Sequence, residues 1–555
     1  MSQHFLKLRA NISLPGDVAL AERELAKRYR EVLPVEDEAA LERNFGLDMA
    51  RILSHSRPNA FAGFLGIGPK QPLQQICQEL ACVQEIWLPA AEVDLPEASF
   101  WKKVDQHVCV MPWMAAGELW GVSKAHPAQP QGLAQLVGDF ALGHPQGNLQ
   151  TKGTSSPHLH GLHRYKARFF PRLARMLLHD AQGPVLDPFV GSGTTLLEAS
   201  LLGQSSLGVD IDPLSVRISQ AKLDLLDLDP AKLEQAIGLL GEPEGGAYVL
   251  PPWMAKKFER KGEVEQQQAL EASIAGWMNA LERVEDPVCK RVLSVCISDG
   301  ISRKFNVRMM GTGVGRFALE VRKTRLDVLI RKSMQSALHQ ARIFALLKSS
   351  YGIQPAPATV VQGNAGALDL DNNSQGFVLT SPPYLPAASG REAYLFSKSI
   401  ALTALGLMTV EEIEQGRSAV VGSMQAGVAE EESLPPGVDD LVAWLEQDEL
   451  RCIKAQPTRA YYQGLRRALQ EAHRVLKPGA KSCWVIGKES VFYTFKTRQV
   501  LRRVHCDQLF VDLAEEVGLS VVDQIDIELQ KRNLNARPRS KDPYFECAIV
   551  LQKST

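Results

Sequence analysis

Residues 183–195 read GPVLDPFVGSGTT, a short apolar strand pattern that runs into a glycine-rich turn, and the helix-like segment LLEASLLG follows at 196–203. Gly191 and Gly193 let the backbone approach a ligand closely, and the start of the helix leaves N–H groups without intrahelical partners. No Gly-Lys-Ser/Thr follows as in a P-loop, and Leu196 stands where a dinucleotide fingerprint needs its third glycine. The stretch therefore predicts a strand–turn–helix unit that holds the polar end of another kind of cofactor.

Short apolar segments of strand character recur along the chain, with helical segments between them, which is typical of a parallel sheet with crossover connections. We expect strands at 183–187, 206–210, 358–362, 376–380 and 481–486, and an antiparallel pair at 521–529 and 545–553. Consecutive strands of such a sheet need only a helix and two short loops between them. The interval 211–357 therefore predicts a large insertion.

Polar motifs follow two other expected strands. Asp210 ends the second strand, with Asp212 two residues on, and an acidic side chain at this place can accept both hydroxyls of a ribose. Thr380-Ser381-Pro382-Pro383-Tyr384 follows the fourth strand. A Pro-Pro-Tyr turn alone can be only a stiff loop. Because ligands bind at the carboxyl ends of parallel strands, we expect the loops at Asp187 and Ser381 to face one crevice.

With these motifs the chain resembles an amino-group DNA methyltransferase. DPFVGSGT at 187–194 is similar to the cofactor motif of that family and SPPY at 381–384 to its catalytic motif. The upstream HRYKARFFPRLARMLL, residues 163–178, resembles the segment that closes over the methionine end of the cofactor. The likeness spans residues 158–555 without the insertion. It implies an α/β fold with a Rossmann-like class I methyltransferase sheet, and S-adenosyl-L-methionine as cofactor.

The resemblance also implies the roles of the site residues. Catalysis is expected at Ser381, Pro382, Pro383 and Tyr384. Cofactor binding is expected at Tyr165, Phe170, Asp187, Pro188, Phe189, Gly191, Ser192, Gly193, Thr194, Asp210 and Asn364.

The chemistry of an exocyclic amine explains the catalytic motif. The lone pair of this nitrogen is delocalised into the base, so the amine is a poor nucleophile. The carbonyl of Pro382 and the side chain of Ser381 can accept its hydrogens and draw the nitrogen toward a tetrahedral geometry, and two prolines fix these acceptors in advance. Tyr384 would stack on a flipped base. The methyl group is then transferred by direct displacement.

The favoured acceptor is cytosine N4 in DNA. By resemblance, SPPY is usual for cytosine-N4 enzymes, whereas DPPY or NPPY is more usual for adenine-N6 and guanine-N2 enzymes. A cytosine-C5 mechanism is disfavoured, because it needs an attacking cysteine in a Pro-Cys context and none of the nine cysteines follows a proline. The alternatives are an adenine-N6 DNA methyltransferase, a tRNA guanosine-N2 methyltransferase, and a catalytically silent nucleic-acid-binding module.

The net charge of -1 provides no global attraction to DNA, so a nucleic-acid contact requires a local basic patch. Residues 303–332 carry nine Lys/Arg against Glu320 and Asp327, around the glycine-rich centre 311–315. This is the best candidate for a phosphate-contacting surface, and a solvated basic helix face is the alternative. The expected nucleic-acid-binding residues are Arg303, Lys304, Arg308, Arg316, Arg322, Lys323 and Arg325.

The 555 residues predict more than one domain. Residues 1–143 form an expected N-terminal α+β accessory domain that could bind nucleic acid, with a strand at 4–9 and a helix at 20–32. The Gly/Pro/Ser/Thr-rich stretch 144–157 is an expected linker. Residues 158–555 form the expected methyltransferase domain, whose mainly helical insertion at about 225–350 is the candidate target-recognition region.

The cysteines and the apolar pattern bound the environment. Nine cysteines without a C-x-x-C pair fit a reduced cytoplasmic protein with no structural metal. No apolar run approaches the ~20 residues that cross a bilayer, so membrane insertion is not expected. No nuclease signature is evident. Any restriction or defence partner, as in a restriction-modification system, would be a separate protein.

Overall fold

The computed structural model describes residues 2–9, 12, 15–35, 63–93, 100–104, 106–122, 129, 131–133, 135, 137, 158–165, 168–309, 317–385, 394–416, 418–423, 433–494, 497, 499–529 and 544–555. The expected linker 144–157, the glycine-rich centre 311–315 and Arg316 lie outside these residues.

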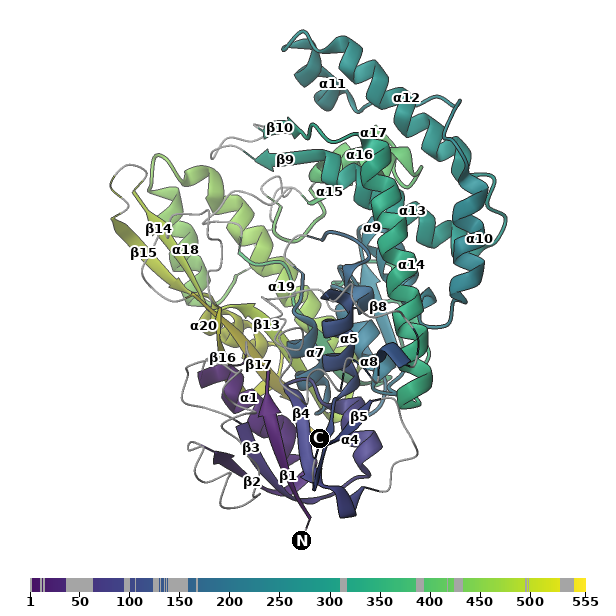
Figure 1. Cartoon of the computed structure of the whole chain (residues 1–555). Helices are drawn as coiled ribbons and strands as arrows, with labels where there is room; N and C mark the ends of the chain where they lie inside the picture. Colours follow the sequence, from purple (N-terminus) through teal and green to yellow (C-terminus); the bar gives the residue numbers. More distant parts are fainter. Residues whose placement is uncertain are drawn as a thin grey trace.

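A mainly parallel sheet forms the centre of the molecule (Figure 1). Its strand order is β11-β8-β7-β12-β13-β17-β16, in which the first five strands run parallel and β17 is antiparallel to both of its neighbours. The strands are β7 (Val185–Asp187), β8 (Ser206–Asp210), β11 (Ala358–Gln362), β12 (Gln375–Thr380), β13 (Leu476–Gly487), β16 (Leu519–Leu529) and β17 (Tyr544–Lys553). The α/β class, the predicted strands and the antiparallel final pair are confirmed.

The order of the strands places a topological switch point between β7 and β12. The chain passes from β7 outward to β8 and β11, and then returns to the other side of β7, where β12 pairs with it through Phe377↔Val185 and Val378↔Leu186. At such a point the two loops that leave the neighbouring strands diverge and open a crevice at their carboxyl ends. The loops at Asp187 and Ser381 are these two loops.

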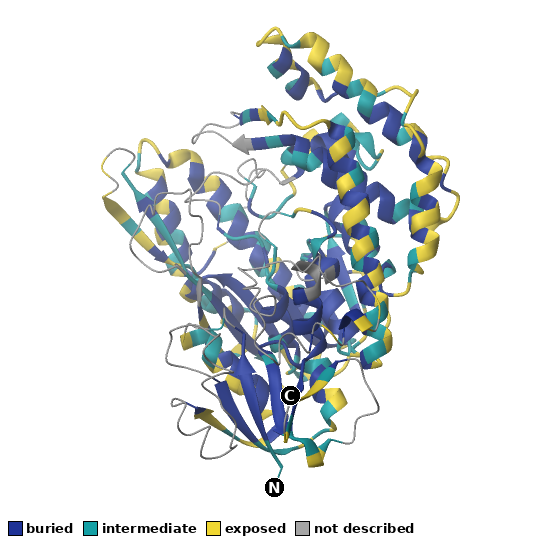
Figure 2. Cartoon of the chain, viewed as in Figure 1, coloured by how far each residue is buried: buried dark blue, intermediate teal, exposed yellow. Residues whose placement is uncertain are grey.

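Side chains of the central strands alternate between two buried layers. Val185 and Phe377 pack with α7 (Pro171–Leu178), whereas Leu186 and Val378 pack with α19 (Ala455–Val475) on the other face. This alternation follows from the two-residue period of a strand, and burial on both faces explains why the segments read as continuous apolar runs. Figure 2 shows the central strands in dark blue beneath these layers.

Further helices flank the sheet and lie beyond it. They are α8 (Thr194–Leu201), α9 (Pro213–Asp224), α15 (Tyr394–Ser397), α16 (Ser399–Ala404), α17 (Val410–Gly416), α18 (Pro436–Glu446), η3 (Cys452–Lys454) and α20 (Cys506–Glu516). A separate hairpin is formed by β14 (Glu489–Tyr493) and β15 (Val500–His505).

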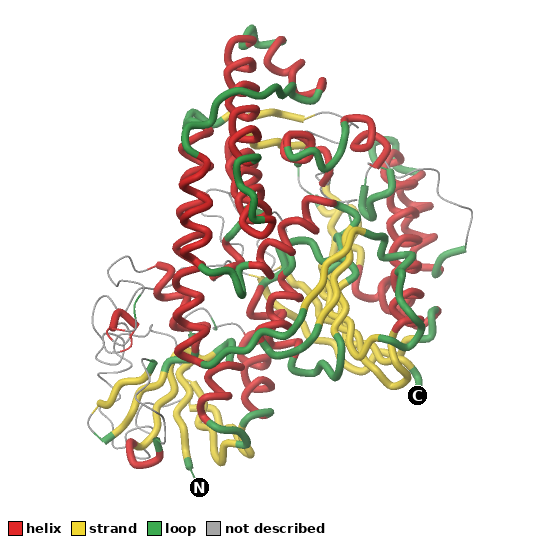
Figure 3. Tube along the Cα trace, turned by 90° about the vertical axis from the view of Figure 1, so that its right-hand side faces the viewer, coloured by secondary structure: helices red, strands yellow, loops and turns green. Residues whose placement is uncertain are grey.

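The interval between β8 and β11 is mainly helical, and Figure 3 shows its long helices in red. Asp229 and Asp286 cap two of these helices by accepting hydrogen bonds from Ala231 N and Cys289 N. The elements are α10 (Pro230–Leu240), α11 (Pro252–Glu259), α12 (Val264–Leu281), α13 (Pro287–Lys304), the antiparallel hairpin β9 (Phe305–Met309) and β10 (Phe317–Val321), and α14 (Leu326–Tyr351).

A second, antiparallel sheet lies in the N-terminal region, with strand order β2-β3-β1-β4-β6-β5. Its strands are β1 (Gln3–Leu8), β2 (Tyr29–Val35), β3 (Gly63–Pro69), β4 (Val83–Pro89), β5 (Trp101–Val104) and β6 (His107–Val110). The helical elements of this region and the turn that follows it are α1 (Pro15–Ala26), α4 (Leu73–Glu79), η1 (Ala90–Glu92), α5 (Trp113–Val122) and η2 (His158–Gly161).

Two local predictions were wrong. The helix expected over 20–32 ends at Ala26, because Tyr29 to Val35 pair with β3 and tertiary pairing overrides the helical pattern. The second is a strand boundary: β13 begins at Leu476, before the strand expected at 481–486, and its register against β12 jumps from Leu476 to Lys481. Gly479 with φ 73° accommodates this bulge.

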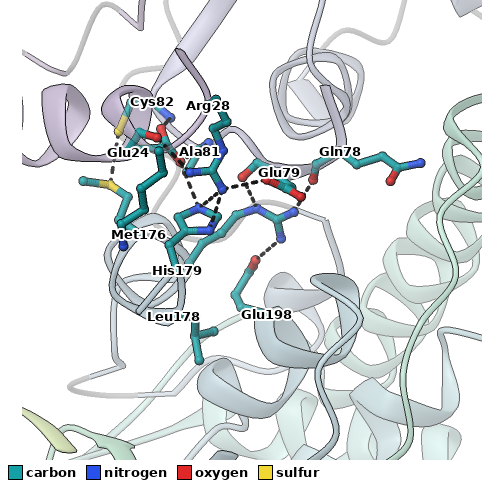
Figure 4. A network of polar contacts seen from close by, with 12 residues as sticks. Glu24, Arg28, Gln78, Glu79, Ala81, Cys82, Met176, Leu178, His179 and Glu198 are labelled. Carbon is teal, nitrogen blue, oxygen red and sulfur yellow. Dashed lines mark hydrogen bonds and ion pairs between the residues drawn. The ribbon is translucent and has the colours of Figure 1, made fainter. Parts of the chain in front are cut away.

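A buried polar network joins the N-terminal region to helices α7 and α8 of the central region (Figure 4). The Glu24 carboxylate accepts hydrogen bonds from Ala81 N at 2.8 Å and Cys82 N at 3.0 Å, and it lies 3.5 Å from His179 Nε2. Arg28 Nη2 pairs with Glu79 at 2.8 Å. The network extends to α8 through Arg175, which donates to Glu198 Oε2 at 2.8 Å. Burial alone would raise the pKa of Glu24, but its bonds to His179, Arg28 and Ala81 lower the pKa to about 2.

No helix in the described part of the chain is both long and apolar enough to span a membrane. The nine cysteines all lie in that part, and all are free thiols.

We expect Glu24→Ala to lower the free energy of unfolding by about 3–5 kcal/mol, because the change leaves the backbone N–H groups of Ala81 and Cys82 without their buried acceptor and removes the carboxylate beside His179. Urea denaturation measures the loss, with Glu22→Ala on the exposed side of the same helix as the control. Since the folded pKa of Glu24 is depressed, this stabilisation is present above about pH 4.5 and is lost as the pH falls toward 2. Equal effects of the two substitutions would contradict the assignment.

Candidate active site

The glycine loop after β7 has a backbone that requires its glycines. Gly191 has φ 51° and Gly193 has φ 76°, in the left-handed region that residues with a Cβ rarely adopt. A Cβ at Gly193 would also lie 2.8 Å from the Cβ of Ser219 in α9. Gly193 is the N-cap of α8, so the loop leads directly into the first turn of that helix. The predicted strand–turn–helix unit is confirmed.

Asp210 at the end of β8 holds this loop in place. Its Oδ2 accepts a hydrogen bond from Gly191 N at 2.8 Å, and its Oδ1 accepts one from Asp212 N at 2.9 Å. Burial and the neighbouring Asp212 raise the pKa of Asp210 to about 6, although Lys398 and the backbone hydrogen bonds oppose the shift. The carboxylate thus organises the loop and also lines the space in front of it.

The loop after β12 is fixed to the glycine loop and to the layer beneath it. Thr380 Oγ1 donates to Asp187 Oδ1 at 2.6 Å, and Asp187 Oδ1 also accepts from Phe189 N at 3.1 Å. On the other side, Tyr461 of α19 donates its hydroxyl hydrogen to the Pro383 carbonyl at 3.0 Å. These bonds, together with two consecutive prolines, hold the Ser381–Tyr384 backbone in one conformation.

The aromatic end of the motif is also held. The Tyr384 hydroxyl donates to Glu546 Oε1 of β17 at 2.8 Å and lies 3.5 Å from Ser381 Oγ. Ser381 and Tyr384 are partly buried, whereas Pro382 is buried.

The two loops share one cavity of about 440 Å³. All four residues of the catalytic motif line it, and so do most of the residues expected to bind the cofactor. Gly193, the N-cap of α8, does not line the cavity. The lining residues expected from the sequence are Tyr165, Phe170, Asp187, Pro188, Phe189, Gly191, Ser192, Thr194, Asp210, Asn364, Ser381, Pro382, Pro383 and Tyr384.

Four charged residues line this cavity but were not among the expected site residues: Arg168, Asp212, Lys398 and Glu546. Lys398 Nζ pairs with Asp212 Oδ2 at 2.5 Å and lies 4.3 Å from the centre of the Tyr165 ring. The segment around Lys398 is thereby joined to the end of β8. Asp212 was visible as the second acid after β8, but no motif indicates Lys398 or Glu546, because each enters the cavity alone from a distant part of the chain.

The basic residues of the stretch 303–332 differ in how far they are buried. Lys304 is 5% exposed, and its ammonium donates to the carbonyls of Arg322 at 2.6 Å and Thr324 at 2.8 Å. Its expected role on a nucleic-acid surface was therefore wrong, because Lys304 closes the base of the β9–β10 hairpin. Arg303 pairs with Asp299 at 2.6 Å.

The remaining basic residues of this stretch differ in what can be said of them. Arg322, Lys323 and Arg325 are exposed, and Arg325 pairs with Asp327 at 2.8 Å. The Arg308 side chain lies outside the described part of the chain. In that part, no group of three or more His, Cys, Asp or Glu residues could hold a metal ion.

Part of this site lies in a segment that matches a known protein family. The DNA methylase family model of N6/N4 methyltransferases matches residues 119–221. This range includes the glycine loop and residues 163–178, which we call the cover segment. The match begins at 119, inside the region 1–143 that the sequence likeness was not expected to reach.

Two relatives are type II methyltransferases. M.MjaII of Methanocaldococcus jannaschii is 38% identical over 88 residues, which cover 15% of this chain and 17% of the relative. M.MvaI of Kocuria varians is 24% identical over 364 residues, which cover 60% of this chain and 77% of the relative. The matched segment thus spans less than a fifth of the first relative and about three quarters of the second.

Among solved structures, a SAM-dependent methyltransferase from Methanosarcina mazei is 12% identical, with a TM-score of 0.25, and the overlap covers 68% of this chain and 97% of that one. Residues 119–221 thus match the family model of N6/N4 DNA methylases, and stretches of the chain are similar to two type II methyltransferases.

Proposed function

We propose that this chain transfers the methyl group of S-adenosyl-L-methionine to an exocyclic amino group of a base in DNA, and that cytosine N4 is the acceptor. The observation that supports this most strongly is the single cavity lined by both the glycine loop and the SPPY loop. A methyl donor and an amine must meet within one enclosure for direct displacement, and these two loops supply one side each.

The glycine-loop side of the cavity fits the cofactor. Asp210 presents a carboxylate that can accept ribose hydroxyls, and the glycine backbone permits close approach of a polar group. Tyr165 and Phe170 of the cover segment contribute aromatic surface to the same space. When bound, S-adenosyl-L-methionine supplies an electrophilic sulfonium methyl group. Asn364, also at the cavity wall, is proposed to contact the adenine part.

The SPPY side fits the amine. The Pro382 carbonyl and the Ser381 hydroxyl accept the hydrogens of the amine, so that the nitrogen lone pair turns toward the methyl donor. Because Tyr461 and Glu546 already hold this loop, little reorganisation is needed as the transition state forms. Tyr384 stacks on the flipped base and returns about 1–3 kcal/mol of the few kcal/mol that flipping costs.

We propose the β9–β10 hairpin as part of the DNA-contacting surface. Arg322 and Lys323 are exposed where the hairpin ends. The hairpin also connects to the cavity, since Phe317 of β10 packs on Phe396 at 4.8 Å between ring centres, two residues before Lys398. Residues 225–350 would then form the target-recognition region. Residues 1–143 would form an accessory domain, and 144–157 the linker between this domain and the methyltransferase domain 158–555. A restriction partner, if the system has one, is a separate protein.

The proposed function is tested by incubating the protein with labelled S-adenosyl-L-methionine and, in parallel, unmethylated duplex DNA and tRNA. We expect label only in the DNA, and nucleoside analysis should identify it as N4-methylcytosine. N6-methyladenine in DNA would retain the reaction but correct the base. N2-methylguanosine confined to the tRNA sample would overturn the proposal.

The two sides of the cavity should also separate by mutation. We expect Tyr384→Ala to lower turnover roughly 5- to 150-fold with little change in cofactor affinity, because its partner is the base. Asp210→Ala should weaken cofactor binding roughly tenfold or more, because it removes an acceptor and loosens the glycine loop. Calorimetric titration with S-adenosyl-L-methionine and methylation kinetics measure both effects. Similar behaviour of the two variants in the titration would contradict this division of roles.

A further inference from the structure

Glu546 lines the cavity, and its role in the proposed reaction is to support Tyr384. It lies on β17, opposite Gly487 of β13, and lines the cavity beside the SPPY loop. Its Oε1 accepts the Tyr384 hydroxyl hydrogen at 2.8 Å, and the same hydroxyl lies 3.5 Å from Ser381 Oγ. The carboxyl group of Glu546 and the hydroxyl of Ser381 therefore both lie next to the hydroxyl oxygen of Tyr384.

A base bound in this part of the cavity would therefore meet two different polar groups, the Glu546 carboxyl and the Ser381 hydroxyl. A carboxyl group has two oxygens, and a single bond to Oε1 is compatible with a second bond from Oε2 to a ligand. Burial raises the pKa of the Glu546 carboxyl, although the hydrogen bond from Tyr384 opposes this shift. A protonated carboxyl is a hydrogen-bond donor, in contrast to the acceptors at Ser381 and Pro382.

The Watson–Crick edges of the candidate bases differ in the group beside the amine. In cytosine the amine at C4 neighbours N3, and in adenine the amine at C6 neighbours N1, and both ring nitrogens are acceptors. In guanine the corresponding ring nitrogen N1 carries a hydrogen and is a donor. An acceptor for the amine next to a donor for the ring nitrogen thus matches cytosine or adenine and opposes guanine.

We propose that the Glu546 carboxyl donates a hydrogen bond to the ring nitrogen beside the methylated amine, and that it selects cytosine or adenine over guanine. This inference rests on the proposed function and adds a specificity residue to it. The Tyr384 hydroxyl donates to Oε1, and this bond restricts the orientation of the carboxyl group at the wall of the cavity.

The test uses the full-length protein and a DNA duplex that contains a methylation site mapped on plasmid DNA. Three variants are compared: Glu546→Ala, Glu546→Gln and Tyr384→Phe. Gln keeps a neutral donor, whereas Phe keeps the ring but removes the hydroxyl contact to Glu546. Each protein is assayed on duplexes with cytosine or 3-deazacytosine at the target, since the deaza base lacks the N3 acceptor. Cofactor titration and the thermal unfolding midpoint verify that each variant is folded.

We expect Glu546→Ala to slow methylation of the cytosine duplex about tenfold, and Glu546→Gln to restore most of the rate. The deaza base should slow the unmodified protein about tenfold but should slow Glu546→Ala no further. If Glu546 acts only through Tyr384, the deaza base will slow Glu546→Ala as strongly as the unmodified protein, and the inference is then wrong. Tyr384→Phe, which keeps Glu546, should still be slowed by the deaza base. Transfer to guanine in the labelling experiment would instead refute the proposed function itself.

Discussion

The site depends on the hydrogen bond from Thr380 to Asp187, which joins the ends of the paired strands β7 and β12. One Asp187 oxygen accepts both this hydroxyl and Phe189 N of the glycine loop, so both loops are held by a single buried atom. Burial raises the pKa of Asp187 to about 6, while the bonds from Thr195, Thr380 and Phe189 oppose the shift. In a low-dielectric site these bonds are strong, and they fix the distance between the proposed methyl donor and acceptor.

Further buried hydrogen bonds connect α7 and α8, which lie next to these loops, to the N-terminal region. Arg175 of α7 donates to Glu198 Oε2 of α8 at 2.8 Å and to the Glu79 carbonyl at 3.0 Å (Figure 4). Glu198 Oε1 lies 2.7 Å from His160 Nε2. Arg175 and Glu198 are both fully buried. The helix that follows the glycine loop is therefore tied to the region of the second sheet, whose α4 contributes the Glu79 carbonyl. Buried pairs of this kind are costly to break, which makes them effective in maintaining one geometry.

Much of the sheet and the convergence of the two motifs could be predicted from the sequence, because each rests on local patterns. Apolar segments marked the strands, and the rule for the carboxyl ends of parallel strands brought Asp187 and Ser381 together. Long-range contacts could not be predicted. Tyr29 reads as helical but pairs with β3, Lys304 reads as a free charge but is buried, and Glu546 reaches Tyr384 across 162 positions of the chain.

We propose that one cavity holds the methyl donor against the SPPY loop. The most direct measurement is a crystal structure of the protein with S-adenosyl-L-methionine. We expect the ribose at Asp210, the glycine loop against the cofactor's polar groups, and the sulfonium methyl facing Ser381 and Pro382. Cofactor density outside the cavity, or a methyl group turned away from the SPPY loop, would contradict the account.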